Sequence, residues 1–324
     1  MDPHHSSTRS VMFARRKFIA SIAATVAGAS LPLAALAADK VIRVGTLKLM
    51  HSITPHFYEQ FAPAGYKIEV IAFETPTDGK NAVVTKSVDF GAFGIAAATL
   101  GGAAGEPVVV IGAQCNKGMA VVAGKDSDIN AIKALKGKKV GILPGSTQEV
   151  VILDRLKQEG LGIKDIQSVR LAFSEMPSAL ERGDIDAYVG AEPGPSISVS
   201  RGVGKIVEYP YGTPTGSLNM VLGTHADTVK NNPALVKLYL QMHRKATEYV
   251  LANRAAFVEM SEKKLGLPAK TVELAAPNIE LTWRIDEDWV TRAKYYGAQM
   301  LDKKQIRQLP DYPTFINTSF AKSL

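Results

Sequence analysis

The segment that decides the fold reads Lys139-Val140-Gly141-Ile142-Leu143-Pro144-Gly145-Ser146. Its first residues have the apolar character of a short buried strand, and the Pro-Gly-Ser that follows is typical of a tight turn. A helix is expected next, over Glu149–Glu159, with apolar residues at Val151, Leu153 and Leu156. A strand that leads through a turn into a helix is the repeating unit of α/β proteins.

The same unit occurs earlier in the chain. The strand expected at Lys40–Thr46 corresponds to the strand above, and Val41 and Val140 are 99 residues apart. Asp89 and Asp186, each in a turn that leads into a strand, are 97 residues apart. Two near-equal offsets predict two lobes built on one topology, each with a largely parallel sheet.

The position of the second unit predicts that one lobe is inserted into the other. We expect lobe 1 over residues 38–127 and 208–324, and lobe 2 over residues 128–207. The chain then crosses between lobes twice, near residues 116–126 and 209–216. Because two parallel connections can bend together, this organisation predicts a hinge and a cleft that closes on a ligand.

The chain beyond the second crossover is mostly helical by pattern. Asn232 is expected to cap one helix, whose apolar residues recur at helical spacing, and Asp286 is expected to cap another. The aromatic residues of these helices, among them Tyr239, Trp289 and Tyr296, are expected in the core rather than at a ligand.

Residues 1–37 are expected to be an export signal that is cleaved before Ala38. Arg15 and Arg16 precede a mildly apolar stretch that ends in small residues. The arginine pair resembles a twin-arginine signal, with the general secretory route as the alternative, and Met12 is an alternative start. We therefore expect the mature protein in the periplasm.

Composition excludes several classes of protein. Of the net charge of +7, +3 lies in residues 1–37, and the remaining lysines and arginines are scattered among acidic residues, which argues against nucleic-acid binding. The single cysteine, Cys115, excludes an intrachain disulfide and lies too far from the cleavage site to carry a lipid anchor. His51 and His56 have no nearby cysteine or acidic cluster, so no metal and no other cofactor is expected.

Several segments together carry a family resemblance: the signal, the strand Val41–Thr46 with His51–Phe57, Leu135–Ile142 followed by Pro144–Thr147, Ala179–Ala187 and Glu192-Pro193. On these segments the chain resembles the solute-binding proteins of ABC importers in the nitrate, sulfonate and taurine group, which includes relatives that bind pyrimidine precursors of thiamine. This resemblance implies an α/β, type II periplasmic-binding-protein fold of two lobes. It also implies a small-molecule ligand between the lobes, and a partner permease with its cytoplasmic ATPase.

The ligand is expected at the carboxyl ends of the strands, where loops meet helix N-termini. The turn Gly145-Ser146-Thr147-Gln148 precedes a helix, so its backbone N–H groups and hydroxyls predict an anion site, with capping by Ser146 or Thr147 as the alternative role. Further candidates follow other strands: Lys48, His51, Ser52, Gly94, Gln114, Asn116 and Glu192. A carboxylate at Glu192 favours an ammonium or a donor-rich ring over a simple anion, unless Glu192 is structural.

These observations predict a monomeric binding protein with no catalytic residues, which captures an anionic or zwitterionic, sulfonate-like or taurine-like solute. The sequence lacks the nucleophile elbow, the phosphate-binding loop and the zinc-protease motif. Three alternatives stay open: a binder of a pyrimidine precursor or aromatic carboxylate, a periplasmic enzyme or pyrimidine synthase on the same fold, and a sensor that presents its ligand to a receptor.

Overall fold

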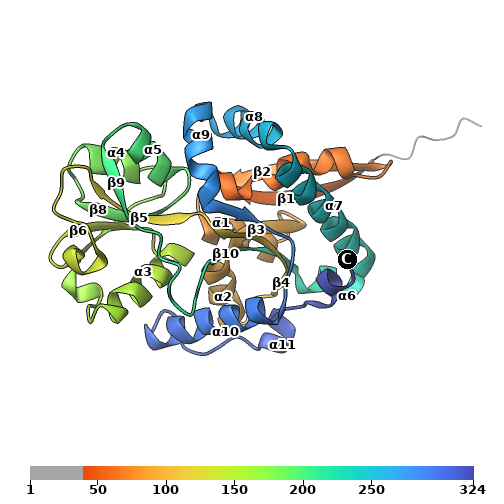
Figure 1. The fold of residues 1–324 in the computed structure, drawn as a ribbon. Helices are drawn as coiled ribbons and strands as arrows, with labels where there is room; N and C mark the ends of the chain where they lie inside the picture. Colours follow the sequence, from red (N-terminus) through yellow and green to blue (C-terminus); the bar gives the residue numbers. More distant parts are fainter. Residues whose placement is uncertain (1–38) are drawn as a thin grey trace, which may run out of the picture. The chain divides into compact units, whose positions relative to one another are not determined.

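Two mixed β-sheets carry the fold in the computed structural model, which describes residues 39–324 (Figure 1). The expected signal, residues 1–37, lies outside the described residues. The first sheet has the strand order β11-β4-β10-β3-β1-β2, formed by Ile279–Leu281, Val108–Lys117, Leu218–His225, Phe90–Gly94, Lys40–Leu47 and Tyr66–Phe73. The second has the order β7-β6-β8-β5-β9, formed by Gln167–Arg170, Lys139–Ile142, Ala187–Ala191, Met119–Gly124 and Gly204–Glu208.

Helices cover both sheets. Those of the first lobe are α1 (Pro76–Val84), α2 (Ile95–Ala103), α6 (Ala226–Asn231), α7 (Pro233–Ala252), α8 (Arg254–Leu265), α9 (Ala269–Ala275), α10 (Glu287–Asp302), α11 (Tyr312–Phe315) and α12 (Ser319–Lys322). Those of the second are α3 (Thr147–Gln158), α4 (Met176–Glu181) and α5 (Gly194–Ser200). Of the described helices, none is long and apolar enough to cross a membrane.

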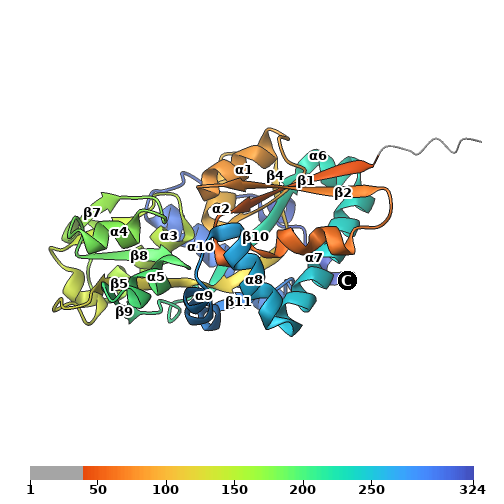
Figure 2. The ribbon, with the colours of Figure 1, turned by 90° about the horizontal axis from the view of Figure 1, so that it is seen from above.

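The core of the first lobe lies on both faces of its sheet. On one face, α7 runs along the strands (Figure 2), and its Tyr239 stacks on Phe90 with ring centroids 3.9 Å apart. On the other face, α1, α2 and α10 pack around Phe93, Trp289 and Tyr296. All of these aromatic side chains are buried, so the expectation that Tyr239, Trp289 and Tyr296 are core residues is confirmed.

The expectation of largely parallel sheets was wrong. Strands β1, β2 and β3 are parallel, as are β6, β7 and β8, but β10 runs antiparallel to β3 and β4, and β5 runs antiparallel to β8 and β9. The reason is that the chain passes directly from β4 into β5 and from β9 towards β10. Strands β5 and β10 therefore begin at the edge of their sheet that faces the other lobe, and they run opposite to the parallel strands beside them.

Strand β5 also bears on the lobe boundary expected at residue 128. It begins at Met119 and pairs within the second sheet, so sheet membership changes at Lys117 and Gly118. Both residues have positive φ, 60° and 73°, a conformation that makes a sharp bend. We therefore propose that the second lobe begins at Met119, ahead of the expected boundary, and ends with β9.

The two lobes share a local arrangement that explains the internal repeat. The Asp89 carboxylate accepts the backbone N–H of Arg43 at 2.7 Å, and the Asp186 carboxylate accepts the backbone N–H of Lys139 at 2.7 Å. In each lobe the aspartate backbone N–H also donates to the carbonyl of the same strand residue. The aspartate of the turn therefore fixes the start of the parallel pair β1–β3 or β6–β8.

Replacing either Asp89 or Asp186 with alanine should lower the free energy of unfolding by a similar amount, about 1–2 kcal/mol, because a backbone N–H loses a charged acceptor. Urea unfolding of the two variants measures it. Asp288→Ala, which removes an exposed i,i+4 ion pair with Arg292, is the control and should cost less. A loss in only one of the two aspartate variants would contradict the equivalence of the lobes.

Candidate functional site

A pocket of about 350 Å³ lies between the lobes, and we call it the interlobe pocket. The first lobe contributes Lys48, Leu49, Glu74, Lys264, Leu265 and Leu267, and the second contributes Phe173, Ser174, Pro177, Ala191, Pro193, Gly194 and Ile197. The lining is therefore mostly apolar, with charged groups only from the first lobe. Such a pocket suits an organic solute with an apolar body.

Of the two lysines at the interlobe pocket, only one is paired within the described chain. Lys48 forms an ion pair with Glu74, which follows the neighbouring strand β2. Lys264, at the end of α8, has no carboxylate partner among residues 39–324. The sequence predicted Lys48 as a ligand residue but missed Glu74 and Lys264. Glu74 lies 26 positions from Lys48 along the chain, and nothing local marks the pair.

The predicted anion site, the turn before α3, is built as a helix N-terminus. Gly145 has φ of +78°, which glycine adopts without steric cost. The Ser146 hydroxyl oxygen accepts the Glu149 N–H at 3.1 Å, so Ser146 is the cap. The Gly145 N–H donates to the Glu149 carboxylate at 2.8 Å, and the Ser146 N–H donates to the Leu143 carbonyl. This leaves the Thr147 and Gln148 N–H groups as first-turn donors without a partner in the described chain.

The same turn meets the first lobe at Gly94, another predicted residue. A Cβ atom at Gly94 would lie 2.6 Å from the Thr147 hydroxyl oxygen, so a larger residue at this position would force the Thr147 side chain to move. The Thr147 hydroxyl donates to the Asn219 carbonyl of β10 at 3.3 Å. Thr147 therefore touches β3 and β10 of the first lobe, and its hydroxyl proton is not available to a ligand anion in this arrangement.

Strand order places the α3 turn beside the interlobe pocket. The turn follows β6, which lies between β7 and β8, and the loops after β7 and β8 contribute Phe173 and Pro193 to the pocket. In the first lobe, Gly94 ends β3, the neighbour of β1, and the loop after β1 contributes Lys48 and Leu49. The pocket and the helix N-terminus thus occupy the same edge of each sheet.

Three predicted residues lie deeper in the first lobe. Gln114 is buried within β4 rather than in a loop, because β4 extends to Lys117, and its amide donates to the His51 carbonyl at 3.3 Å and to the Thr54 hydroxyl at 3.2 Å. The Ser52 hydroxyl is engaged by Thr46 and by the Leu47 N–H. Ser52 and Gln114 therefore shape the end of β1.

His51 and Gln114 each keep one polar atom free of partners. His51 Nδ1 and Gln114 Oε1 are buried and have no hydrogen-bond partner within residues 39–324. Burial lowers the pKa of His51 from 6.5 to about 3, so its imidazole is neutral at physiological pH. A neutral imidazole is a hydrogen-bonding group rather than a charge for an anion.

Glu192 belongs to the hinge rather than to an open cleft. Its side chain is 1% exposed, and it accepts the Ser196 N–H at 3.2 Å and the Asn278 amide at 3.2 Å. Burial raises the pKa of the Glu192 carboxyl group. These contacts favour the structural role that the sequence left as an alternative.

Asn278 and Tyr211, which the sequence did not reveal, join the crossovers. The Tyr211 hydroxyl bonds to the Met119 carbonyl at 2.9 Å and to Asn278 at 2.5 Å, and the Gly118 N–H donates to the Asn278 carbonyl at 2.6 Å. Tyr211 lies 92 residues from Met119 and 67 residues from Asn278 in sequence, so no local motif marks these contacts.

Asn116 lies away from the interlobe pocket. Its amide donates to Glu280 at 3.0 Å, and it lines a separate, polar pocket of about 550 Å³ beside Lys117, Arg284 and Arg292. In the region that the structure describes, no group of histidine, cysteine, aspartate and glutamate side chains is arranged to hold a metal ion.

Two lobes on two mixed sheets, a double crossover and a pocket lined by both lobes define the periplasmic-binding-protein fold. Solved structures show the same fold. The alkanesulfonate-binding protein SsuA from Xanthomonas axonopodis pv. citri, bound to MOPS, superposes with a TM-score of 0.77 at 19% identity, over 87% of this chain and 100% of that chain. The nitrate-binding protein NrtA from Synechocystis PCC 6803 superposes with a TM-score of 0.67 at 14% identity, over 88% of this chain and 86% of that chain.

The family model described as NMT1/THI5 like matches residues 58–256, and the chain belongs to this family. A Bacillus subtilis protein named for binding aliphatic sulfonates is 24% identical over 87% of both chains. An Escherichia coli protein of the same name is 26% identical over 64% of this chain and 65% of its own length. A Haemophilus influenzae protein named for thiamine biosynthesis is 27% identical over 65% of this chain and 64% of its own length. The expected resemblance to the sulfonate and nitrate group of binding proteins is confirmed.

Proposed function

We propose that this protein is the periplasmic solute-binding component of an ABC importer, and that it captures a small organic anion or zwitterion between its lobes. The interlobe pocket carries this proposal, because both lobes contribute to its lining. A solute bound there contacts both lobes, so its binding energy favours the closed arrangement. Delivery to a membrane permease with a cytoplasmic ATPase follows from this role.

The chemistry of the pocket supports a solute with two unlike ends. Side chains such as Leu49, Phe173 and Ile197 suit an apolar body, and the free Lys264 ammonium suits an anionic group. The Thr147 and Gln148 N–H groups at the start of α3 offer a second place for an anion. A sulfonate with an aliphatic or aromatic body meets both requirements, whereas nitrate leaves the apolar lining unused.

A pyrimidine precursor is the second candidate, because relatives named for thiamine biosynthesis and for pyrimidine phosphate synthesis are 27% and 26% identical to this chain, over 65% and 61% of its length. A ring of this kind also fills an apolar pocket. The catalytic motifs named above are missing from the sequence, which favours binding over synthesis. Chemical conversion of the bound compound would instead indicate a synthase.

A thermal-shift panel on the mature chain separates these candidates. It should contain alkanesulfonates and arylsulfonates of increasing size, taurine, nitrate, aromatic carboxylates and hydroxymethylpyrimidine. A solute at a hundred times its Kd stabilises the folded protein by about 2.7 kcal/mol, which raises Tm by a few degrees. Native mass spectrometry should then find one unchanged solute per chain. A solute of altered mass would indicate an enzyme, and no response to any compound would contradict the proposal.

Ser146→Ala tests the anion site at α3. The Ser146 hydroxyl accepts the Glu149 N–H, so its own proton is free to donate to a ligand anion. Losing one such donor should weaken binding of an anionic solute about tenfold. Because the cap is lost too, titration calorimetry must be done where the variant is folded. Ser127→Ala, in the turn after β5, is the control, because it loses only a hydrogen bond to the Gly124 carbonyl. Equal affinity in both variants would show that the anion does not bind at the α3 turn, and Lys264 would then be the expected anion site.

A further inference from the structure

The Glu149 carboxylate on α3 is shared between the two lobes. Its Oε2 atom accepts the Gly145 N–H at 2.8 Å within the second lobe. The same oxygen accepts the side-chain amide of Gln305 at 2.9 Å, and Gln305 follows α10 in the first lobe. One carboxylate oxygen therefore ties the first turn of α3 to the other lobe.

The contact between the lobes continues along α3 and α10. Lys157, two turns further along α3, pairs with Asp302 at the end of α10, with 3.1 Å between Nζ and Oδ2. At the opposite end of the contact, the Thr147 hydroxyl reaches the Asn219 carbonyl. Figures 1 and 2 both show α3 beside α10.

The Lys157–Asp302 pair contributes less to this contact than the Gln305–Glu149 bond. Both partners of the ion pair are about half exposed, and water screens such pairs. Glu149 is partly buried, and burial raises its pKa. A hydrogen bond from an amide to a partly buried carboxylate is stronger than an exposed pair. Separation of the lobes breaks the Gln305 contact but leaves the Gly145 contact, which belongs to the second lobe alone.

We propose that the Gln305–Glu149 bond is a latch, which holds α3 against the first lobe and so regulates how readily the solute site opens. This inference rests on the proposed function for the site that it regulates. The latch acts at the same turn whose Thr147 and Gln148 N–H groups form the proposed anion site. Loss of the latch therefore favours the open protein and speeds the exchange of solute.

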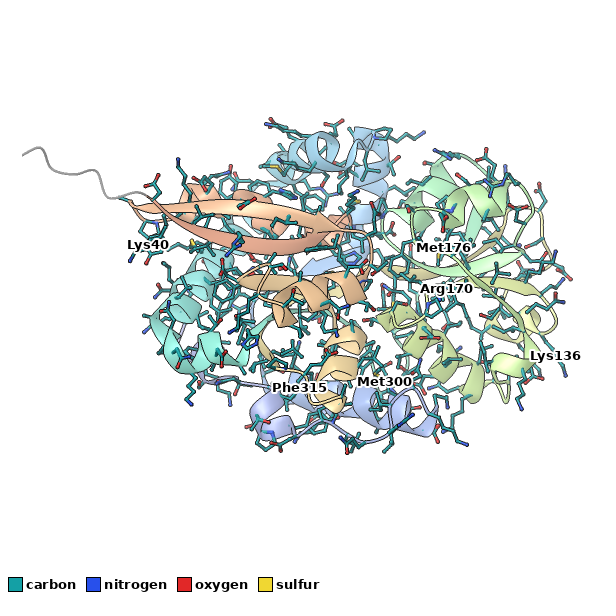
Figure 3. The ribbon with its side chains drawn as sticks, turned by 180° about the vertical axis from the view of Figure 1, so that it is seen from behind. Lys40, Lys136, Arg170, Met176, Met300 and Phe315 are labelled. Atoms are coloured by element: carbon teal, nitrogen blue, oxygen red, sulfur yellow. The ribbon has the colours of Figure 1, made fainter. Side chains whose placement is uncertain are left out.

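Energy transfer between two dyes measures the latch without any solute. Lys40 and Lys136 are exposed and lie in different lobes (Figure 3), so cysteines at both positions, with Cys115→Ala, report lobe separation. Gln305→Ala should lower the ratio of closed to open molecules about tenfold, the effect of one hydrogen bond to a charged group. Gln308→Ala, which loses only a bond to the Ala103 carbonyl within the first lobe, is the matched control and should leave the ratio unchanged.

Two further variants at position 305 test whether the contact with Glu149 sets the ratio of closed to open molecules. Gln305→Lys keeps a donor for Glu149 and should restore the closed population, whereas Gln305→Glu places two carboxylates together and should open the protein further. A ratio in Gln305→Ala equal to that in Gln308→Ala overturns the latch. Because no solute is present, that result leaves the proposed function standing. A normal latch in a protein that binds no solute would instead count against the proposed function.

Discussion

Replacing Gly94 with alanine should lower solute affinity about ten- to a hundredfold and leave the free energy of unfolding nearly unchanged. The added Cβ lies 2.6 Å from the Thr147 hydroxyl oxygen, across the lobe boundary, but 3.7 Å or more from every other atom. The added methyl group therefore strains only the contact between the lobes, which a protein with separated lobes would not make. Overpacking of this kind costs about 1–3 kcal/mol, which lowers the population of the closed form correspondingly.

The Thr147 contact supplies the control. Thr147→Ala removes the hydroxyl that the new methyl group meets, so the double variant Gly94→Ala, Thr147→Ala should bind more tightly than Gly94→Ala alone. Titration calorimetry measures affinity, and urea unfolding checks that each variant is folded. Affinity in Gly94→Ala equal to that of the parent protein would show that capture does not need this closure.

The second large effect is expected in acid. His243 is buried in the first lobe, where its Nε2 lies 3.0 Å from the Ala113 carbonyl, so that Nε2 must donate. Its Nδ1 accepts from the Tyr58 hydroxyl at 2.8 Å. A proton on Nδ1 would reverse the hydrogen bond with Tyr58 and place a charge in the core, and burial lowers the pKa of His243 to about 4. Burial likewise lowers the pKa of His51 to about 3.

Both folded-state pKa values lie below the ordinary value of 6.5, so the unfolded chain binds these protons first. The stability that they contribute is complete above pH 6.5 and is lost as pH falls towards 4 and 3. From pH 6.5 to pH 4.5, each histidine should cost about 2–3 kcal/mol. Buried carboxyl groups with raised pKa values, such as Glu192, act in the opposite direction.

Comparison with a variant isolates the histidine. Glutamine at position 243 offers one donor and one acceptor but does not titrate, so His243→Gln should reduce the pH dependence of the unfolding free energy by about one proton between pH 6 and pH 4.5. The carboxyl contributions cancel in this difference. Denaturant unfolding at a series of pH values measures it, and an unchanged slope would show that His243 does not titrate there.

The parts of the fold that local patterns specify were predictable. The side chains of Asn232 and Asp286 accept the first N–H groups of α7 and α10, as expected, and the turn before α3 is capped by Ser146. The repeated aspartates also occupy equivalent places. Each of these features depends on residues within a few positions, or on an offset that is visible in the sequence.

Features that depend on contacts between distant segments were not predictable. The direction of β5 and β10 follows from the path of the chain between sheets, which apolar patterning does not encode. The loops predicted as one site are in fact distributed: Lys48 lines the interlobe pocket, Gln114 is buried in β4, and Glu192 bonds to Asn278 in the hinge. Lys264 comes from a helix end whose sequence has no distinguishing motif.

One solute should contact both lobes at once. A crystal structure of the mature chain, grown with the compound that raises Tm most in the thermal-shift panel, would show whether it does. We expect the solute in the interlobe pocket, with its apolar body between Leu49 and Phe173 and its anionic group at Lys264 or at the first turn of α3. A solute bound to one lobe alone, or in the polar pocket beside Asn116, would contradict it.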